Sequence, residues 1–500
     1  MSKKALYLCC LAEPWISVAE QLEAHDIVPV YFVYWEADKE LFSKTFKGEC
    51  HFQTMGDAWK GLGFPEGLRP KALDELEFKE IAWHELNALK MMDRLDPLGN
   101  VFGFQERRYF FQDLVGYWLA YIYEYGLDVV ISPSIPHRVF DYALYVACKL
   151  KGIKFLMLQM VPFGSNSMII DDIDSIGDAY KFNLYNGESR KPSVKVQQKI
   201  EKIKSDYSVA VPSYMINHKK NNKLTFKKGV DDFLKPLVKV ILSYVGYKKK
   251  PSTYWVKRGN MPAASNYSWL EFQITKIKRV LKVRSMQNQY EKLISSSIPE
   301  KFVLFALHYQ PEETSCPTGG SYADQISLLR VLDEVLPKGV AILVKEHKSQ
   351  FYTHQESASG RDKSFYYRLS QASNRVLFAS VDATPFELID KAIATVTISG
   401  TIGWESAIRG TPVLVFGRAW YETMPRVHKV KSKSDIISVL SKLSDEKNRN
   451  LDSLIFDYHY QLEKMFVHAK HYKSYLANED ISLRRSEANL SRAFLDILEN

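Results

Sequence analysis

Residues 394–417 read ATVTISGTIGWESAIRGTPVLVFG. The run begins with β-branched residues typical of a buried strand, turns at Ser399, and continues in a helix that starts near Thr401. Gly410 follows the end of this helix, and a second apolar strand begins at Pro412. The order strand, turn, helix, strand indicates an α/β domain with a parallel sheet.

The turn itself has the chemistry of a ligand site. Gly400 and Gly403 allow the backbone to turn tightly and to approach a ligand. The first N–H groups of the helix and its positive dipole end suit a phosphate, and Ser399 and Thr401 add hydroxyl groups. Glu405 lies one turn further along, where its carboxylate can accept from two ribose hydroxyls. A tight strand–helix connection without a ligand is the alternative, but the whole run favours nucleotide binding.

The same alternation of strands and helices extends through 271–430. We interpret this range as one complete Rossmann-type nucleotide-binding domain. Strands are expected at 301–307, 340–345, 376–378, 394–398 and 412–416, and helices at 322–336, 366–372, 385–392 and 401–409.

Residues 1–190 predict a second Rossmann-like domain, so the fold class is α/β with two such domains. Strands are expected at 5–11, 28–33, 128–133 and 153–158, helices at 16–25 and 137–151, and a largely helical stretch at 55–125. A basic helical insertion is expected at 191–270, and helices at 431–500 that pack back on the first domain.

The positive charge of the chain is concentrated in one segment. Residues 190–258 hold 18 Lys/Arg and 4 Asp/Glu, a net of +14, whereas the whole chain carries +9. Basic helices with an apolar stripe suit an anionic membrane surface, here the inner leaflet of the cell membrane. A solvated helical hairpin is an equal alternative. Nucleic acid is not expected as a partner, because no known nucleic-acid module is visible.

Cysteine usage and hydropathy favour the cytoplasm. The five cysteines include no Cys-x-x-Cys pair, which argues against a zinc cage or a disulfide framework. The apolar run at the N-terminus is short for a signal peptide, and no long apolar segment predicts a membrane span. We expect a cytoplasmic protein that is either free or peripheral on the inner face of the membrane.

Further candidate residues follow two other strands of the second domain. Lys345, Glu346 and His347 end the strand at 340–345, at the sheet edge where ligands bind. Glu312 and Glu313 lie in the loop 307–325, where a carboxylate can serve as nucleophile or as acid and base. A structural histidine and a solvated loop are the alternatives for these two segments.

The first domain offers candidates at the corresponding strand ends. Glu13 follows the first strand, and His137, Arg138 and Asp141 follow the strand at 128–133. His137 is a candidate base, and the other three are candidate acceptor-binding residues; a plain helix start is the alternative. The pair Asp172 and Asp174 resembles a metal-binding Asp-x-Asp, but such pairs are frequent in loops, and no metal site is expected.

Residues 307–325, 344–347 and 398–417 resemble the capsule polysaccharide synthesis family, whose studied members include β-Kdo transferases that use CMP-Kdo. A weaker likeness extends through 128–158. The resemblance implies a GT-B architecture, in which two Rossmann-like domains face a cleft. It also implies that 271–430 binds the sugar nucleotide and that 1–190 binds the acceptor. No cofactor is expected besides the nucleotide sugar used as substrate, because the start of the helix supplies the positive charge.

The resemblance assigns roles to single residues. His347 matches the histidine of the family's His-Pro pair and is expected to contact the CMP phosphate, whereas Lys348 replaces the proline. Glu312 is the nearest counterpart of the family's catalytic aspartate, and His308 stands where the family tends to have glutamine. The family's Ser/Thr-Gly-Thr turn and following glutamate match Ser399, Gly400, Thr401 and Glu405.

The sequence therefore predicts a glycosyltransferase that moves a sugar, from CMP-Kdo or another CMP-linked acidic sugar, to a polysaccharide or glycolipid in capsule or O-antigen synthesis. Two alternatives stay open: a sugar-nucleotide 2-epimerase of the same architecture, and a non-catalytic glycan-binding or export adaptor. The chain lacks a Walker A loop, His-Glu-x-x-His and Gly-x-Ser-x-Gly, which argues against an NTPase, a zinc hydrolase or a serine hydrolase.

Overall fold

The fold was analysed in a computed structural model of the chain. It describes residues 2–46, 50–96, 98–99, 102–177, 180–184, 190–207, 234–235, 237–238, 241–242, 269–352, 357–442 and 450–499. The chain forms two compact units, and each is described by itself. The first contains Met1–Asp172, Lys249–Phe272 and Met465–Asn500, and the second contains Ile173–Lys248 and Gln273–Lys464.

The first unit is built on a seven-stranded sheet with the order β13-β6-β5-β4-β1-β2-β3. Strands β1 to β5 pair in parallel, whereas β6 and β13 pair antiparallel at one edge. The strands are β1 (Lys3–Cys10), β2 (Ile27–Tyr34), β3 (His51–Thr54), β4 (Val129–Ser132), β5 (Lys154–Met160), β6 (Asn166–Ile170) and β13 (Val467–His468). The helices are α1 (Ala12–Glu23), α2 (Lys39–Thr45), α3 (Met55–Ala58), α4 (Glu75–Met91), α5 (Phe104–Tyr125), α6 (Val139–Lys151) and α17 (Leu483–Leu498), with short 3-10 turns at Glu36–Asp38, Met92–Leu95 and Lys473–Tyr475.

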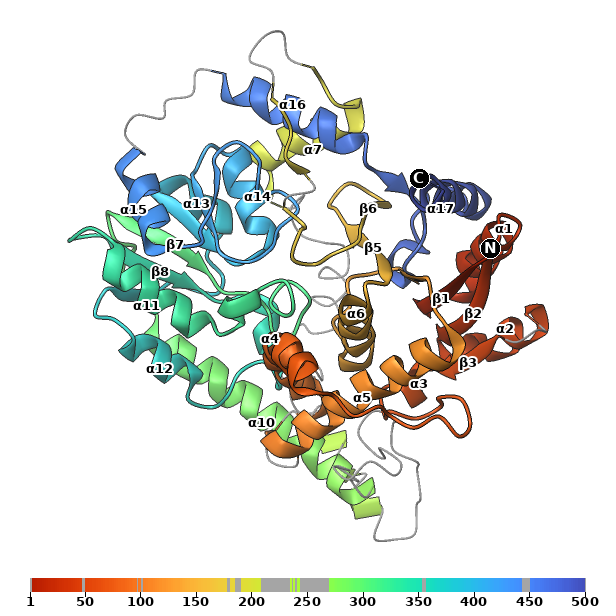
Figure 1. The fold of residues 1–500 in the computed structure, drawn as a ribbon. Helices are drawn as coiled ribbons and strands as arrows, with labels where there is room; N and C mark the ends of the chain where they lie inside the picture. Colours follow the sequence, from red (N-terminus) through yellow and green to blue (C-terminus); the bar gives the residue numbers. More distant parts are fainter. Residues whose placement is uncertain are drawn as a thin grey trace. The chain divides into compact units, whose positions relative to one another are not determined.

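The last helix of the chain covers the first one. Figure 1 shows α17 beside α1, and Trp15 packs against Phe494 in a shared apolar cluster. The Trp15 indole N–H donates to the backbone oxygen of His471 at 2.9 Å. Residues near the C-terminus therefore complete the core of the first unit.

The second unit is built on a six-stranded, all-parallel sheet with the order β12-β11-β10-β7-β8-β9. The strands are β7 (Phe302–Ala306), β8 (Ala341–Lys345), β9 (Val376–Phe378), β10 (Ala394–Thr397), β11 (Val413–Val415) and β12 (Val427–Lys429). The helices are α7 (Val194–Ser205), α10 (Trp269–Leu293), α11 (Gln325–Val335), α12 (Phe365–Gln371), α13 (Pro385–Lys391), α14 (Thr401–Ile408), α15 (Lys433–Lys442) and α16 (Leu451–Glu463), with 3-10 turns at Gly320–Ala323 and Lys348–Phe351.

This strand order is the doubly wound order of dinucleotide-binding domains, counted from β7. Helices α11 and α12 lie on one side of the sheet, and α13 and α14 lie on the other (Figure 1). The chain reverses its direction of winding between β7 and β10, and ligands of such sheets bind beyond the carboxyl ends of the strands at that point. The prediction of two Rossmann-like domains is confirmed, with an antiparallel edge in the first.

Three details differ from the sequence-based expectation. The tail at 431–500 is not helical throughout, because β13 lies within it and pairs with β6. The units also do not follow the expected boundaries at 190 and 270, since Ile173–Lys248 belongs to the second unit. The stretch expected to be helical at 55–125 contains a loop between α3 and α4.

The basic segment at 190–258 is described only in part. Its first helix, α7, buries Val196, Ile200 and Ile203, so the apolar stripe of this helix faces the protein. Most of the remaining segment lies outside the described residues. Of the helices that the structure describes, none combines the length and the apolar run needed to cross a bilayer.

Candidate functional site

The candidate site lies at the switch point of the second unit, where the loops after β7 and β10 meet. His308 follows β7, and Ser399 precedes α14. The Ser399 backbone N–H donates to His308 Nε2 at 3.1 Å, which joins the two loops directly. The Ser399 hydroxyl donates to the backbone oxygen of Thr314 and lies 3.2 Å from the Thr318 hydroxyl. The Ser399 side chain therefore braces the loops, so the hydroxyl expected to bind phosphate is already engaged.

The hydrogen bond from the Ser399 N–H determines which ring nitrogen of His308 carries the proton. A ring nitrogen that accepts a hydrogen bond carries no proton, so the neutral imidazole bears its proton on Nδ1. Nδ1 is buried and has no hydrogen-bond partner in the part of the chain that the structure describes. Burial, with His347 and Arg361 nearby, lowers the pKa of His308 to about 3. His308 is thus a neutral donor at physiological pH with an unused N–H group.

The start of α14 adds backbone donors beside His308. Gly400 is needed here because a Cβ atom at this position would lie 3.0 Å from His308 Nε2. The Gly400 N–H donates to the Thr397 hydroxyl at 3.2 Å. Within the described residues, no hydrogen bond engages the N–H groups of Thr401 and Ile402, the first two of the helix. These groups and the helix dipole favour an anion.

Glu405 lies one turn into α14, and its side chain is 6% exposed. Burial raises the pKa of Glu405 to about 7, while a hydrogen bond from Thr401 and the charge of Lys199 act in the opposite direction. Thr401 lies one turn earlier on the helix, on the side toward which helical side chains lean. Gly403, by contrast, serves packing, since a Cβ there would lie 2.5 Å from the Tyr421 hydroxyl.

The loop after β8 holds the second group of predicted residues. Lys345 is 8% exposed, burial lowers its pKa to about 8, and its ammonium group donates to the Val381 backbone oxygen at 3.2 Å. His347 Nδ1 accepts from the Ser349 N–H at 3.3 Å, and burial lowers the pKa of His347 to about 4. Lys348, in the position of the family's proline, pairs with Asp382 at the surface. His347 is therefore a neutral side chain, as His308 is.

Sequence reasoning missed the ion pair that supports both loops. The side chains of Arg361 and Glu346 are both fully buried, with Arg361 Nε 3.3 Å from Glu346 Oε2. Arg361 also donates to the backbone oxygen of His308 at 2.8 Å and to the side chain of Gln310. Glu346 accepts from the Tyr366 hydroxyl at 2.6 Å. Glu346, which lies between Lys345 and His347 at the end of the strand, therefore points into the core.

Glu312 and Glu313 lie in the loop after β7 and are partly exposed. The Glu312 backbone oxygen accepts from the N–H of Cys316 at 2.9 Å, and its carboxylate accepts from the Thr314 hydroxyl at 3.1 Å. The Glu313 backbone oxygen accepts from the Thr318 hydroxyl at 2.9 Å. The loop is thus held by its own backbone, and both carboxylates belong to the segment that Ser399 and Arg361 brace.

The candidates in the first unit lie at the start of α6. Asp141 accepts from the Arg138 N–H at 2.6 Å and the His137 N–H at 3.2 Å, so it caps the helix. Burial raises the pKa of Asp141 to about 6, although Arg138 opposes this. His137 Nδ1 donates to the Ile135 backbone oxygen at 2.7 Å, and burial lowers its pKa. These contacts are those of a helix start, whereas Glu13 is exposed at the start of α1.

The Asp-x-Asp pair has cationic neighbours. The Asp172 carboxylate accepts from the Tyr145 hydroxyl and from Lys149 at 3.3 Å, within the first unit. Asp174 forms an ion pair of 3.9 Å with Arg418 in the second unit. Among the described residues, no group of three or more acidic, histidine or cysteine side chains is placed to hold a metal ion.

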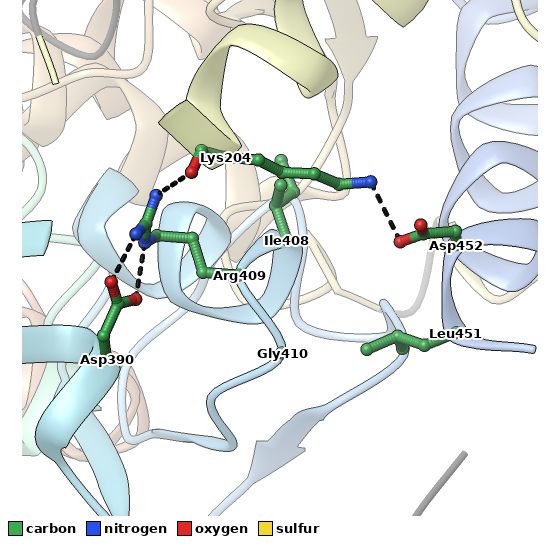
Figure 2. Close-up of a pocket in the computed structure, with 7 residues that line it drawn as sticks. All are labelled: Lys204, Asp390, Ile408, Arg409, Gly410, Leu451 and Asp452. Carbon is green, nitrogen blue, oxygen red and sulfur yellow. Dashed lines mark hydrogen bonds and ion pairs between the residues drawn. The ribbon is translucent and has the colours of Figure 1, made fainter. Parts of the chain in front are cut away.

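A surface pocket of about 270 Å³ lies at the other end of α14 (Figure 2). Its lining consists of Lys204, Asp390, Ile408, Arg409, Gly410, Leu451 and Asp452. Helix α14 begins at the carboxyl edge of the sheet, so its last turn lies at the opposite edge from Ser399. The pocket is therefore separate from the switch point.

The strand order and the connections at the switch point define the second unit as a Rossmann-type domain. Within the chain, residues 252–425 match the model of a family described as capsule polysaccharide biosynthesis protein. The match includes the loops after β7, β8 and β10, and it confirms the resemblance to the capsule polysaccharide synthesis family over these residues. No curated protein sequence matches the chain significantly.

Three solved structures illustrate what the chain is similar to. The β-Kdo 2,4 transferase KpsC of Thermosulfurimonas dismutans is 11% identical, with 67% of this chain and 80% of that chain covered and a TM-score of 0.29. Staphylococcus aureus MnaA with UDP is 13% identical, with 91% of each chain covered and a TM-score of 0.21. The UDP-GlcNAc 2-epimerase of Methanocaldococcus jannaschii is 11% identical, with 93% of this chain and 99% of that chain covered and a TM-score of 0.22. Likeness at this level does not bear on activity.

Proposed function

We propose that the chain is a glycosyltransferase that binds a nucleotide sugar at the switch point of the second unit. The observation that carries the proposal is the unpartnered Nδ1–H of His308 beside the start of α14. Together with the N–H groups of Thr401 and Ile402, it offers neutral donors to a phosphate. Such prearranged donors stabilise the negative charge that develops on a departing phosphate.

The remaining roles follow from position. Glu405 accepts from the ribose hydroxyls, and His347 and Lys345 contact the phosphate from the neighbouring strand. Glu312, with Glu313 beside it, provides the carboxylate at the anomeric carbon. The donor is CMP-Kdo or another CMP-linked acidic sugar, by analogy with the family that residues 252–425 match.

The acceptor is a polysaccharide or glycolipid under construction at the inner face of the cell membrane. Glu13, Arg138 and Asp141 lie beyond strand ends of the first unit, where an acceptor site is expected. Attachment to anionic lipid through 190–258 stays a prediction. Sedimentation with vesicles containing phosphatidylglycerol, compared with neutral vesicles, tests it, and equal sedimentation would refute it.

A thermal-shift comparison of CMP, UDP and GDP tests the nucleotide site. A ligand that binds only the folded state stabilises it by about 2.7 kcal/mol when its concentration is about one hundred times its Kd. We expect CMP to stabilise the protein and UDP and GDP to have smaller effects. A preference for UDP would exclude the CMP-linked donor, and the absence of any shift would exclude the site.

A product assay tests the reaction class. A transferase releases CMP only when an acceptor is present, whereas a 2-epimerase converts its sugar nucleotide without one. Glu312→Gln should abolish polymer synthesis and leave CMP binding intact. Full synthesis by this variant would instead favour an adaptor that does no chemistry.

A further inference from the structure

The loop that follows β11 reaches the turn at the start of α14. The Gly417 N–H donates to the Ile398 backbone oxygen at 2.8 Å, so the chain beyond β11 continues alongside the chain beyond β10. The Arg418 N–H donates to the Thr318 backbone oxygen at 2.7 Å, in the loop after β7. Tyr421 follows three residues later and is fully buried. The sequence pattern gives no sign of a role for this tyrosine.

The Tyr421 hydroxyl donates to the backbone oxygen of Gly400. This oxygen belongs to the same peptide group as the Thr401 N–H, which no hydrogen bond engages in the part of the chain that the structure describes. The Gly400 oxygen also accepts from the Gly403 N–H at 3.0 Å, within the helix. The peptide group between Gly400 and Thr401 is therefore held at its oxygen by two hydrogen bonds, while its N–H stays available.

The Tyr421 hydroxyl is a permanent donor to this oxygen. Burial, with Glu405 and Glu422 nearby, raises the pKa of Tyr421, so the hydroxyl keeps its proton at physiological pH. The ring occupies the space that a side chain at position 403 would need, because a Cβ atom on Gly403 would lie 2.5 Å from the hydroxyl oxygen and 2.9 Å from Cε2 and Cζ. Glycine is unfavourable inside a helix, so the approach of the tyrosine explains why glycine stands there.

The loop that carries Tyr421 is fixed by contacts of its own. The Tyr458 hydroxyl of α16 donates to the Trp420 backbone oxygen at 3.0 Å. The Trp420 ring packs on the Trp404 ring, with the two centroids 5.8 Å apart. The Met424 N–H donates to the Tyr421 backbone oxygen at 3.0 Å. Tyr421 is therefore a fixed support for the turn.

We propose that Tyr421 is a positioning residue of the nucleotide site, whose hydroxyl fixes the peptide group between Gly400 and Thr401 so that the Thr401 N–H meets the phosphate. This inference rests on the proposed function. A hydrogen bond to the oxygen of a peptide group also polarises its N–H, because hydrogen bonds in a chain strengthen one another. Tyr421 thus acts on the phosphate through the backbone and not by contact with the ligand.

The proposal predicts a selective loss of phosphate binding. Tyr421→Phe keeps the buried ring and removes only the hydroxyl, so the Gly400 oxygen loses its donor from outside the helix. The nucleobase and the ribose do not use the Thr401 N–H, and the loss should therefore fall on the phosphate. A variant that merely loosened the fold would weaken ligands with and without a phosphate equally.

Calorimetric titrations with CMP and with cytidine, which lacks the phosphate, measure this selectivity. We expect Tyr421→Phe to weaken CMP binding by a factor between about two and about ten, the range that one hydrogen bond supplies, and to leave cytidine binding unchanged. Tyr121→Phe is the matched control, because the Tyr121 hydroxyl donates to the Val30 backbone oxygen at 3.3 Å in the first unit. Its CMP affinity should equal that of the natural chain. Unchanged CMP affinity in Tyr421→Phe, or equal weakening of CMP and cytidine, would overturn the proposal.

A second measurement needs no nucleotide. The Thr401 amide signal is followed by NMR in protein with nitrogen-labelled threonine, and it is assigned from its absence in Thr401→Ser. The amide proton should move to higher field in Tyr421→Phe, because the peptide group loses a polarising bond, and it should stay in place in Tyr121→Phe. A Thr401 signal that does not move in either variant would contradict the inference. If the natural chain does not bind CMP, the proposed function fails, while the Thr401 signal still decides whether Tyr421 acts on the turn.

Discussion

Arg361 and Glu346 form an ion pair at 3.3 Å in which neither side chain is exposed. The guanidinium also donates to the backbone oxygen of His308, so one buried charge pair joins the loops after β7 and β8. A buried charge is costly unless it is paired and hydrogen-bonded, which both partners are here. The geometry of the candidate site therefore depends on a pair that does not belong to the site.

Breaking this pair should destabilise the protein strongly. Arg361→Met leaves the Glu346 carboxylate buried without a counter-charge, and we expect a loss of about 3–5 kcal/mol in the free energy of unfolding measured with urea. Arg368→Met is the matched control, because Arg368 pairs with Asp362 at the surface. Its loss should be about 0–1 kcal/mol. Similar small losses in both variants would show that the buried pair is not needed.

Substitutions of His308 should separate its acceptor and donor roles. His308→Leu leaves the Ser399 N–H without an acceptor, which should cost about 1–3 kcal/mol of stability, and it also removes the free donor. His308→Gln keeps an acceptor and a donor, as in the related family. We expect CMP affinity, measured by calorimetry, to fall severalfold in the leucine variant and to persist in the glutamine variant. If both variants bound CMP as tightly as the natural chain does, His308 would be excluded from the phosphate site.

Gly400 should not tolerate a side chain. The Cβ atom of Gly400→Ala would lie 3.0 Å from His308 Nε2 and 3.3 Å from the Thr397 hydroxyl, so the histidine must move. We expect a loss of about 1–3 kcal/mol, as for other overpacked sites, together with weaker CMP binding. Gly56→Ala is the control, because its nearest neighbour lies at 3.7 Å. Thermal melts with and without CMP compare the two variants.

Stability should fall on acidification because of buried neutral histidines. Burial lowers the pKa values of His459 and His471 to about 4, whereas an unfolded histidine titrates near about 6.5. The unfolded state therefore binds more protons below about pH 6.5, and stability present above that value is lost toward pH 4. The slope is at most about 1.4 kcal/mol per pH unit for each histidine.

Both histidines also use both ring nitrogens. His459 Nε2 accepts from the Trp404 indole N–H at 2.9 Å while Nδ1 donates to the Ile455 oxygen at 2.7 Å. Protonation of His459 would place its Nε2–H group against the indole N–H of Trp404, which can only donate. Urea unfolding between pH 8 and 4 should show a smaller slope in His459→Gln than in the natural chain. A pH-independent stability in the natural chain would contradict this account.

Much of the fold was predictable because central parallel strands are buried on both faces. The apolar runs at 301–307 and 340–345 correspond to β7 and β8 to within one residue at each end. The end of α6 was equally clear, since Gly152 adopts the left-handed conformation at φ 66° that such a terminus favours. Strand β13 was not predictable, because two residues show no period and its pairing partner lies some 300 positions earlier.

The candidate site was predictable in its location but less so in its contacts. The Ser-Gly-Thr turn and the lysine–histidine strand end do lie at the carboxyl edge of one sheet. The inward direction of Glu346 was not visible, because its partner Arg361 is fifteen residues away in a loop without periodicity. The engagement of the Ser399 hydroxyl by Thr314 likewise depends on how two distant loops fold against each other.

The pairing of β13 with β6 and the cover of α1 by α17 bear on how the chain is made in the cell. The first unit begins to leave the ribosome before the second, but its sheet edge and the apolar face around Trp15 stay open until residues 467–498 have been synthesised. The second unit is complete at Lys464. Domains usually fold in the order of their synthesis. Here we expect the later unit to fold first, so that the nascent first unit needs protection by chaperones during most of translation.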